Sequence, residues 1–156
     1  MNEALIKEIQ DKHINLVAVT KKHTKEEVDQ LHALGLSVFG ENRVQEFLTK
    51  YDPAYTWHII GHLQTNKVKY IIGKVDVIES LDSIKLAKEI EKQAKKQDLV
   101  QKVFVELKVS QTDENKTGYP YQDAMNFLAE LQQFPHIKVK GLMCIATHTD
   151  DQAVNI

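Results

Sequence analysis

The sequence predicts an α/β fold of parallel strands alternating with helices, arranged as an incomplete (β/α) barrel. Six apolar, strand-like runs alternate with helical patterns at a spacing of roughly 25 residues, as parallel strands joined by right-handed crossovers do. Polar motifs follow successive strands, which favours a barrel rim over the alternative, a doubly wound sheet. A complete barrel has eight strands and about 250 residues. The 156 residues therefore supply about six of eight βα units, and we expect residues 1–156 to form one partial barrel domain.

The predicted elements alternate along the chain. We expect strands over 16–20, 37–40, 57–61, 75–79, 103–109 and 139–145. We expect helices over 2–12, 25–34, 41–50, 64–72, 84–96 and 121–133. Thr24 and Glu27 have the spacing of a capping box, and Thr149 or Asp150 is placed to cap a further helix. The first and last strands are each left with an open apolar edge, which favours pairing with another chain.

Composition is ordinary for a globular protein of the cytoplasm. The chain is 42% hydrophobic and 27% charged with a net charge of −2, and its lysines and acids are interspersed, so we expect neither a nucleic-acid nor a membrane partner. The acid-containing N-terminal stretch is unlike a signal peptide, which predicts a cytoplasmic location. The single cysteine, Cys144, lies in the apolar run GLMCI and is expected to be a buried, reduced thiol.

The run LVAVTKK at 16–22 predicts a buried strand that delivers a lysine to its carboxyl end. An ammonium shielded there loses hydration, so its pKa falls and the nucleophilic amine that Schiff-base chemistry requires becomes accessible. The alternative is that Lys21 and Lys22 are only the solvated end of the strand. The alternation of side chains does not choose between the two lysines.

Five motifs in order resemble one known family. They are AVTK at 18–21, FGENRVQE at 39–46, WHIIGHLQTNK at 57–67, VSQTDENKTG at 109–118 and GLMCI at 141–145. Together they resemble the pyridoxal phosphate homeostasis protein family, also called the YggS or proline synthetase co-transcribed homologue family. The resemblance implies a TIM (β/α) barrel of the alanine racemase N-terminal type. It also implies a non-catalytic protein of intracellular PLP homeostasis that holds pyridoxal 5'-phosphate as a Schiff base on Lys21.

Four further residues are candidates for cofactor binding, each with a structural alternative. Asn42 is placed to face the cofactor ring or to cap the next helix. Gly61 allows close backbone approach at the rim or merely turns the chain. His58 lies within a strand, where a hydrogen-bonded core histidine is the alternative, and its i,i+4 spacing to His62 does not predict a metal site because a strand separates such residues. Met143 is placed to contact the ring or to fill the core.

The remaining polar candidates carry less information. We expect Asp113, Glu114 and Lys116 to lie in an exposed loop, and nothing in the sequence assigns a partner to His148. The Ser/Gly-rich turn and the Arg-Ile-Gly-Thr run that hold the cofactor phosphate in the family are not found in this chain. We therefore expect weak or no binding of pyridoxal phosphate unless a missing segment or a second copy completes the barrel.

Three other functions remain as alternatives. A racemase-like enzyme of amino acids needs a second acid/base group, which a second domain supplies in the racemases. A barrel fragment that associates or domain-swaps without binding cofactor is expected from the open edges. A Schiff-base aldolase is compatible with the lysine alone. For the leading hypothesis, the partners are pyridoxal phosphate and PLP-dependent apoenzymes; the chain is expected to be a monomer if the barrel is completed and a domain-swapped homo-oligomer otherwise.

Overall fold

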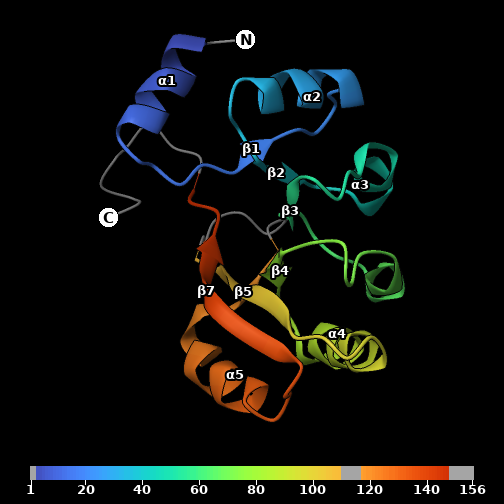
Figure 1. Ribbon diagram of the computed structural model, residues 1–156. Helices are drawn as coiled ribbons and strands as arrows, with labels where there is room; N and C mark the ends of the chain where they lie inside the picture. The colour runs from blue at the N-terminus through green and yellow to red at the C-terminus, as the bar shows by residue number, and fades with distance from the viewer. Residues whose placement is uncertain (1–2, 110–116, 148–156) are drawn as a thin grey trace.

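The computed structural model describes residues 3–109 and 117–147, in which strands and helices alternate (Figure 1). The strands are β1 (Ala18–Val19), β2 (Val38–Glu41), β3 (Thr56–Ile59), β4 (Val77–Leu81), β5 (Gln101–Lys108), β6 (Tyr119–Pro120) and β7 (Ile137–Cys144). The α-helices are α1 (Glu3–Asp11), α2 (Lys25–Ala33), α3 (Val44–Lys50), α4 (Ile84–Lys96) and α5 (Ala124–Leu131). Two 3-10 helices complete the set, η1 (Thr65–Tyr70) and η2 (Tyr121–Asp123).

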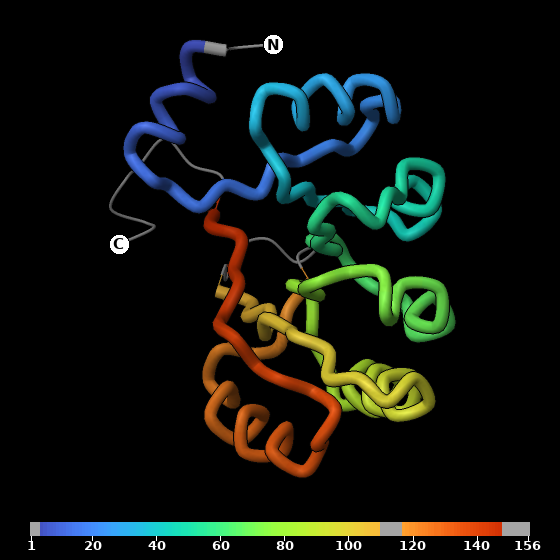
Figure 2. Tube along the Cα trace, in the orientation of Figure 1, coloured from blue at the N-terminus to red at the C-terminus, as the bar shows by residue number. Residues whose placement is uncertain are grey.

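All the strand pairs are parallel, and the sheet follows the order β1-β2-β3-β4-β5, with β6 and β7 both pairing with β5. The strands lie along an arc, with α2, α3, α4 and α5 on its outer side (Figures 1 and 2). Within the described residues, β1 pairs with β2 alone and β7 with β5 alone. The prediction of an incomplete (β/α) barrel is confirmed.

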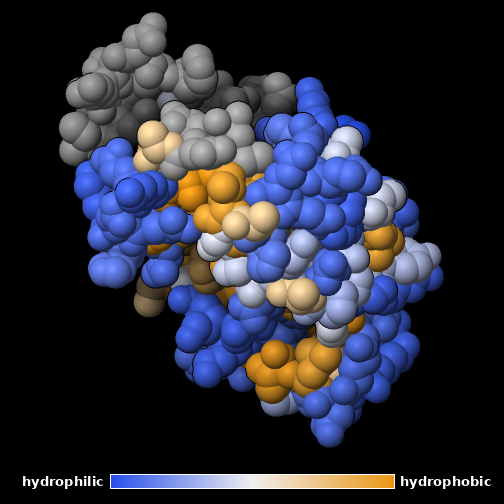
Figure 3. Space-filling view, turned by 45° about the horizontal axis from the view of Figure 1, so that its top comes forward, coloured by the Kyte–Doolittle hydropathy of each residue, from blue (hydrophilic) through white to orange (hydrophobic). Residues whose placement is uncertain are grey.

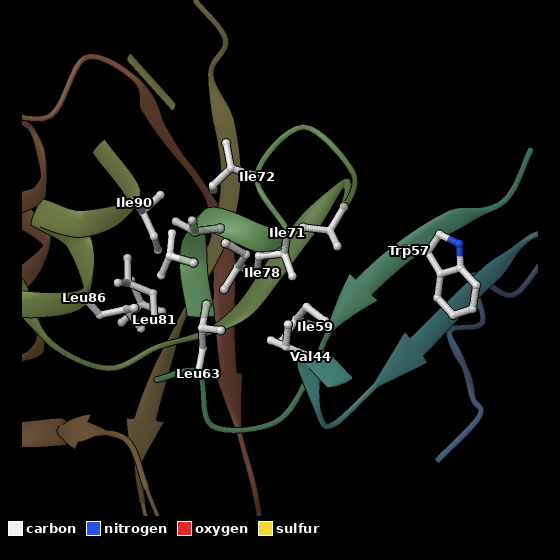
Figure 4. Packing of buried hydrophobic residues seen from close by; sticks show 14 of the residues in the cluster. Val44, Trp57, Ile59, Leu63, Ile71, Ile72, Ile78, Leu81, Leu86 and Ile90 are labelled. Atoms are coloured by element: carbon white, nitrogen blue, oxygen red, sulfur yellow. The ribbon is translucent and has the colours of Figure 1, made fainter. Parts of the chain in front are cut away.

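The two faces of the sheet have different chemistry because successive side chains on a strand point in opposite directions. The outer face packs on the helices and carries fully buried apolar side chains: Phe39, Trp57, Ile59, Ile78, Val103 and Val105. In Figure 4, Ile59 of β3, Ile78 of β4 and Ile71 beside η1 point toward one another in this layer. The inner face carries the alternate residues, among them Gly40, His58 and Glu106. The hydrophobic core therefore lies mainly outside the arc, and the inner face mixes these residues with apolar ones such as Val77 and Phe104.

Several boundaries differ from the predicted ones. The first strand shrinks from 16–20 to Ala18–Val19, the two residues that form ladder pairs with β2. The helix expected over residues 64–72 is present as the shorter 3-10 helix η1, and the buried residues at i and i+3, Val68 and Ile71, fit this type of helix. The strand β6 was not predicted. The expected helix 121–133 is shortened to Ala124–Leu131, because its first three residues form the 3-10 helix η2.

The capping box that begins α2 is confirmed. The Thr24 hydroxyl accepts a hydrogen bond from the backbone N–H of Glu27 at 3.3 Å. The Glu27 carboxylate in turn accepts from the backbone N–H of Thr24 at 2.7 Å. Two backbone donors at the helix N-terminus are thus satisfied, which ties α2 to the turn that precedes it.

The edge strands expose apolar side chains, as predicted. Val19 of β1 is 48% exposed and Leu142 of β7 is 57% exposed. Cys144 is exposed too, so the prediction of a buried thiol is wrong. It lies opposite the buried Leu107, but the described residues place no helix over this end of β7. Figure 3 shows hydrophobic patches interrupting an otherwise hydrophilic surface. In residues 3–109 and 117–147, every helix is too short or too polar to cross a bilayer.

Candidate functional site

The end of β1 is a tight turn that contains both lysines of the LVAVTKK run. The backbone N–H of Thr20 donates to the carbonyl oxygen of Gly40 at 3.0 Å, which continues the pairing of β1 with β2. The backbone N–H of His23 then donates to the carbonyl oxygen of Thr20 at 3.1 Å, which closes a turn over Lys21 and Lys22. Lys22 has φ 66°, the left-handed conformation that a type II turn requires at its third residue. The backbone direction at Lys21 is therefore set by a defined turn.

Thr20 lies on the outer face, and Lys21 is the first residue of the turn that follows it. Thr20 is fully buried, and its hydroxyl donates to Glu41 Oε1 at 2.7 Å, on the side where α3 packs. Lys21 is exposed, so the prediction of an amine shielded from water is wrong for this structure. The reason is that β1 has no neighbour on its other side among the described residues, which leaves the inner rim open beside Lys21.

Behind the turn lies a buried ion pair. Lys50 Nζ, from the last residue of α3, lies 2.6 Å from Glu41 Oε1 and donates to the carbonyl oxygen of Thr20 at 2.7 Å. Lys50 is 5% exposed and Glu41 is fully buried. Burying two charges is costly unless each is hydrogen-bonded, and Thr20 supplies both a donor and an acceptor to the pair. The strand end that carries Lys21 is thus anchored to helix α3.

Asn42 and Gly61 lie together at the rim, beside Lys21. In the β1–β2 register, Val19 lies opposite Gly40. The residues two positions further along, Lys21 and Asn42, therefore reach the same level of the rim. A Cβ at Gly61 would lie 2.6 Å from the carbonyl oxygen of Asn42, so the predicted close backbone approach is confirmed as an approach to Asn42 itself. Only glycine fits there without displacing a backbone group.

The amide of Asn42 does not cap the next helix. Arg43 is the N-cap of α3, and this helix N-terminus has no side-chain capping hydrogen bond. Asn42 Oδ1 is buried and has no hydrogen-bond partner in the described part of the chain. Buried amide oxygens are nearly always bonded, so an unpartnered one at a rim is suited to a ligand donor. The capping alternative is therefore wrong, and Asn42 remains a candidate for ligand binding.

A polar cleft of about 350 Å³ adjoins this amide. Its lining residues come from the segments that follow β2 and β3, including the start of α3 and part of η1: Asn42, Arg43, Val44, Gln45, His62, Gln64 and Lys67. The cations Arg43 and Lys67 give the cleft a positive lining, which favours an anionic ligand group.

The two histidines of the WHIIGH run bond to different acids. His58 is largely buried, and its Nδ1 lies 2.6 Å from Glu79 Oε1 on the inner face. His62 Nδ1 lies 3.1 Å from Asp82 Oδ2 at the rim. In residues 3–109 and 117–147, no group of three or more His, Cys, Asp and Glu side chains is placed to hold a metal ion. His58 is thus the hydrogen-bonded histidine of the alternative hypothesis, although it also faces the inside of the barrel.

Glu106 is a buried acid on the inner face that no sequence motif singled out. It is 2% exposed, its Oε1 accepts from the Thr117 hydroxyl at 2.7 Å, and its Oε2 has no partner among the described groups. Burial raises the pKa of the Glu106 carboxyl, as does nearby Asp82, whereas the Thr117 hydrogen bond and His62 oppose the rise. Met143 lies opposite Glu106 in the β5–β7 register, so both belong to the inner face. The only signal was an acid in the otherwise strand-like run VFVELKV.

Other candidates lie outside the described residues. They are Asp113, Glu114, Lys116, His148, Thr149 and Asp150. The structure brings together Lys21, Asn42 and Gly61 at the rim, with His58 deeper on the inner face and Met143 on the far edge strand.

A family model described as alanine racemase, N-terminal domain, matches residues 2–155. The chain belongs to this family. Among solved structures of known proteins, this family member resembles PipY of Synechococcus elongatus PCC7942 with PLP bound, at a TM-score of 0.87 and 28% identity over 98% of this chain and 74% of PipY. It also shares the fold of alanine racemase from Clostridium difficile 630, at a TM-score of 0.73 and 15% identity over 94% of this chain and 41% of the racemase.

Curated relatives carry the name pyridoxal phosphate homeostasis protein. The Aquifex aeolicus protein is 42% identical over 140 residues, which are 87% of this chain and 61% of the relative. The Helicobacter pylori (strain ATCC 700392 / 26695) protein is 34% identical over 145 residues, which are 89% of this chain and 65% of the relative. The resemblance predicted from the five motifs is confirmed. This family member spans less than two thirds of the length of these two relatives.

Proposed function

We propose that this chain is a pyridoxal 5'-phosphate-binding protein of PLP homeostasis, without a catalytic reaction of its own, that attaches the cofactor to Lys21. The observation that carries the proposal is the rim, where Lys21 lies in a tight turn at the end of β1 and the next strand leads to the amide oxygen of Asn42, which has no partner among the described residues. The names of the relatives and the PLP-bound PipY structure support it. PLP-dependent apoenzymes are the acceptors that we expect for a carried cofactor.

The rim residues fit the cofactor in part. When bound, the cofactor would supply an aldehyde with which the Lys21 amine could condense, with loss of water. Asn42 Oδ1 would be free to accept a hydrogen bond from a cofactor donor, and Gly61 allows the close backbone approach that holds Asn42 in place. Arg43 and Lys67, which line the adjoining cleft, would attract its phosphate.

Borohydride trapping with peptide mapping tests the proposal. The chain is incubated with pyridoxal phosphate, reduced, digested and analysed by mass spectrometry for pyridoxyl-lysine. We expect the adduct on Lys21, its loss in Lys21→Ala, and its persistence in the matched control Lys22→Ala. An adduct spread evenly over surface lysines, or one that survives Lys21→Ala, would contradict the proposal.

A racemase-like activity is the second candidate, and the His58–Glu79 pair favours it. An imidazole bonded to a carboxylate on the inner face is an acid/base group of the type that racemisation needs. Incubation with L-alanine and pyridoxal phosphate, followed by optical rotation, tests it. Sustained loss of rotation that disappears in His58→Gln supports an enzyme, and a constant rotation supports the non-catalytic proposal.

The exposed edges of β1 and β7 favour association between copies of the chain, in line with the hypothesis of an associating barrel fragment. Val19 and Leu142 expose apolar surface beside unpaired strand edges, which are templates for further pairing. Size-exclusion chromatography with light scattering tests this. A compact monomer over a wide concentration range would rule out edge pairing as the dominant behaviour.

A further inference from the structure

Helix α3 holds both peptide groups that flank Lys21. The ammonium of Lys50 donates to the carbonyl oxygen of Thr20, which belongs to the peptide before Lys21, at 2.7 Å. Glu46 Oε2 accepts from the backbone N–H of Lys22, which belongs to the peptide after Lys21, at 3.1 Å. Glu46 and Lys50 are four residues apart and so lie on one face of α3. One helix turn thus contacts the lysine turn on both sides.

The conformation of the turn requires such support. Lys22 has φ 66°, and a side chain with a Cβ is disfavoured in this left-handed region. Residues persist there only where the surrounding structure holds them. The His23 N–H bond to Thr20 closes the turn from within, and Glu46 and Lys50 hold it from outside.

We infer that Glu46 and Lys50 are positioning residues, which fix the turn so that Lys21, and not its neighbour Lys22, presents its amine to an aldehyde on the inner face. This inference rests on the proposed function of Lys21. Both residues bond the turn through its backbone groups, and the second partner of Lys50, Glu41, lies on the outer face with Thr20. If the two contacts only docked α3, their loss would lower stability without changing which lysine reacts.

Glu46 is the better residue to change, because it is partly exposed whereas Lys50 is buried with Glu41. Glu46→Ala removes the acceptor for the Lys22 N–H. Glu46→Gln keeps a side-chain oxygen in place and serves as the conservative rescue. Thr49→Ala, an exposed change on the same helix, is the matched control.

The first measurement is amide hydrogen exchange, which needs no cofactor. In Glu46→Ala we expect the exchange rate of the Lys22 backbone N–H to rise roughly tenfold, which corresponds to the loss of a hydrogen bond to a charged acceptor. The urea midpoint of global unfolding should change little. Glu46→Gln should restore most of the protection, and Thr49→Ala should leave it unchanged. Equal exchange at Lys22 in the unmodified chain and Glu46→Ala overturns the inference.

The second measurement is the division of the borohydride-trapped pyridoxyl adduct between Lys21 and Lys22. We expect the ratio to favour Lys21 in the unmodified chain and to fall severalfold in Glu46→Ala, with recovery in Glu46→Gln. A ratio that is the same in all variants overturns the positioning role. If the unmodified chain forms no Lys21 adduct, the proposed function fails, and the exchange measurement still decides whether Glu46 holds the turn.

Discussion

The buried pair of Glu41 and Lys50 gives the sharpest stability prediction. Lys50→Met keeps the length of the side chain but removes an ammonium that lies 2.6 Å from Glu41 Oε1. The Glu41 side chain is 0% exposed, and its second oxygen already lacks a partner among the described groups, so the carboxylate would keep only the Thr20 hydroxyl. Breaking a buried pair in this way costs about 3–5 kcal/mol. For a chain of this size, that corresponds to a fall in Tm of roughly 10 °C.

Urea unfolding followed by circular dichroism measures the change, with an unchanged slope as the check on two-state behaviour. The matched control is Lys92→Met, since Lys92 is 59% exposed and lies 3.4 Å from Glu89, so its loss should barely move the midpoint. The double variant Glu41→Leu/Lys50→Met should recover much of the loss, because apolar replacement of a whole buried pair is often neutral. If Lys50→Met shifts the urea midpoint no more than Lys92→Met does, the pair of Glu41 and Lys50 is solvated and the reasoning fails.

Three further changes probe separate features. Gly61→Ala places a Cβ 2.6 Å from the carbonyl oxygen of Asn42 and should lower the free energy of unfolding by about 1–3 kcal/mol; Gly141→Ala, where the nearest atom is 3.7 Å away, should not, and equal melting temperatures would refute the collision. Because burial raises the pKa of Glu106 above its ordinary value, the folded chain binds this proton more tightly than the unfolded chain, and the carboxyl costs stability as the pH rises above the ordinary pKa of a glutamate, about 4.3. The stability of the unmodified chain relative to Glu106→Gln, from urea midpoints between pH 4 and pH 8, should therefore fall with pH, and a flat difference would contradict the burial. Thr24→Ala removes the cap of α2 and should cost about 1 kcal/mol in urea unfolding, whereas Thr24→Ser should be almost neutral; an equal loss in both would argue against the hydroxyl bond.

Local patterns predicted the parts of the fold that depend on local chemistry. The capping box at Thr24 and the strand that contains Val103 follow from residue type and spacing, and both are present. The exposure of an edge residue depends on what packs beside its strand, and a local sequence pattern does not contain that information. Lys21 and Cys144 were therefore wrongly expected to be buried, and both are exposed.

The candidate site was predicted in outline, and its details depend on tertiary contacts. Asn42 has the propensity of a helix cap, but the chain places Arg43 at that position and leaves the amide of Asn42 at the rim. Glu106 went unnoticed because a single acid in an apolar run is indistinguishable from an exposed edge residue until the neighbouring strands are known. Glu46 and Lys50 were seen only as part of a helix, since their contacts cross to a turn more than 20 residues earlier.

The charged network behind β1 also specifies the register that makes Lys21 available. A shift of one residue between β1 and β2 would exchange the faces, placing Lys21 beside Glu41 and turning Thr20 inward. That arrangement would bring a second ammonium next to Lys50 in a buried site and remove the hydroxyl that donates to Glu41. Because one carboxylate does not compensate two buried cations, the shifted register is strongly disfavoured. The pair of Glu41 and Lys50 therefore favours the register that keeps Lys21 away from the buried site, whether or not the pair itself adds net stability.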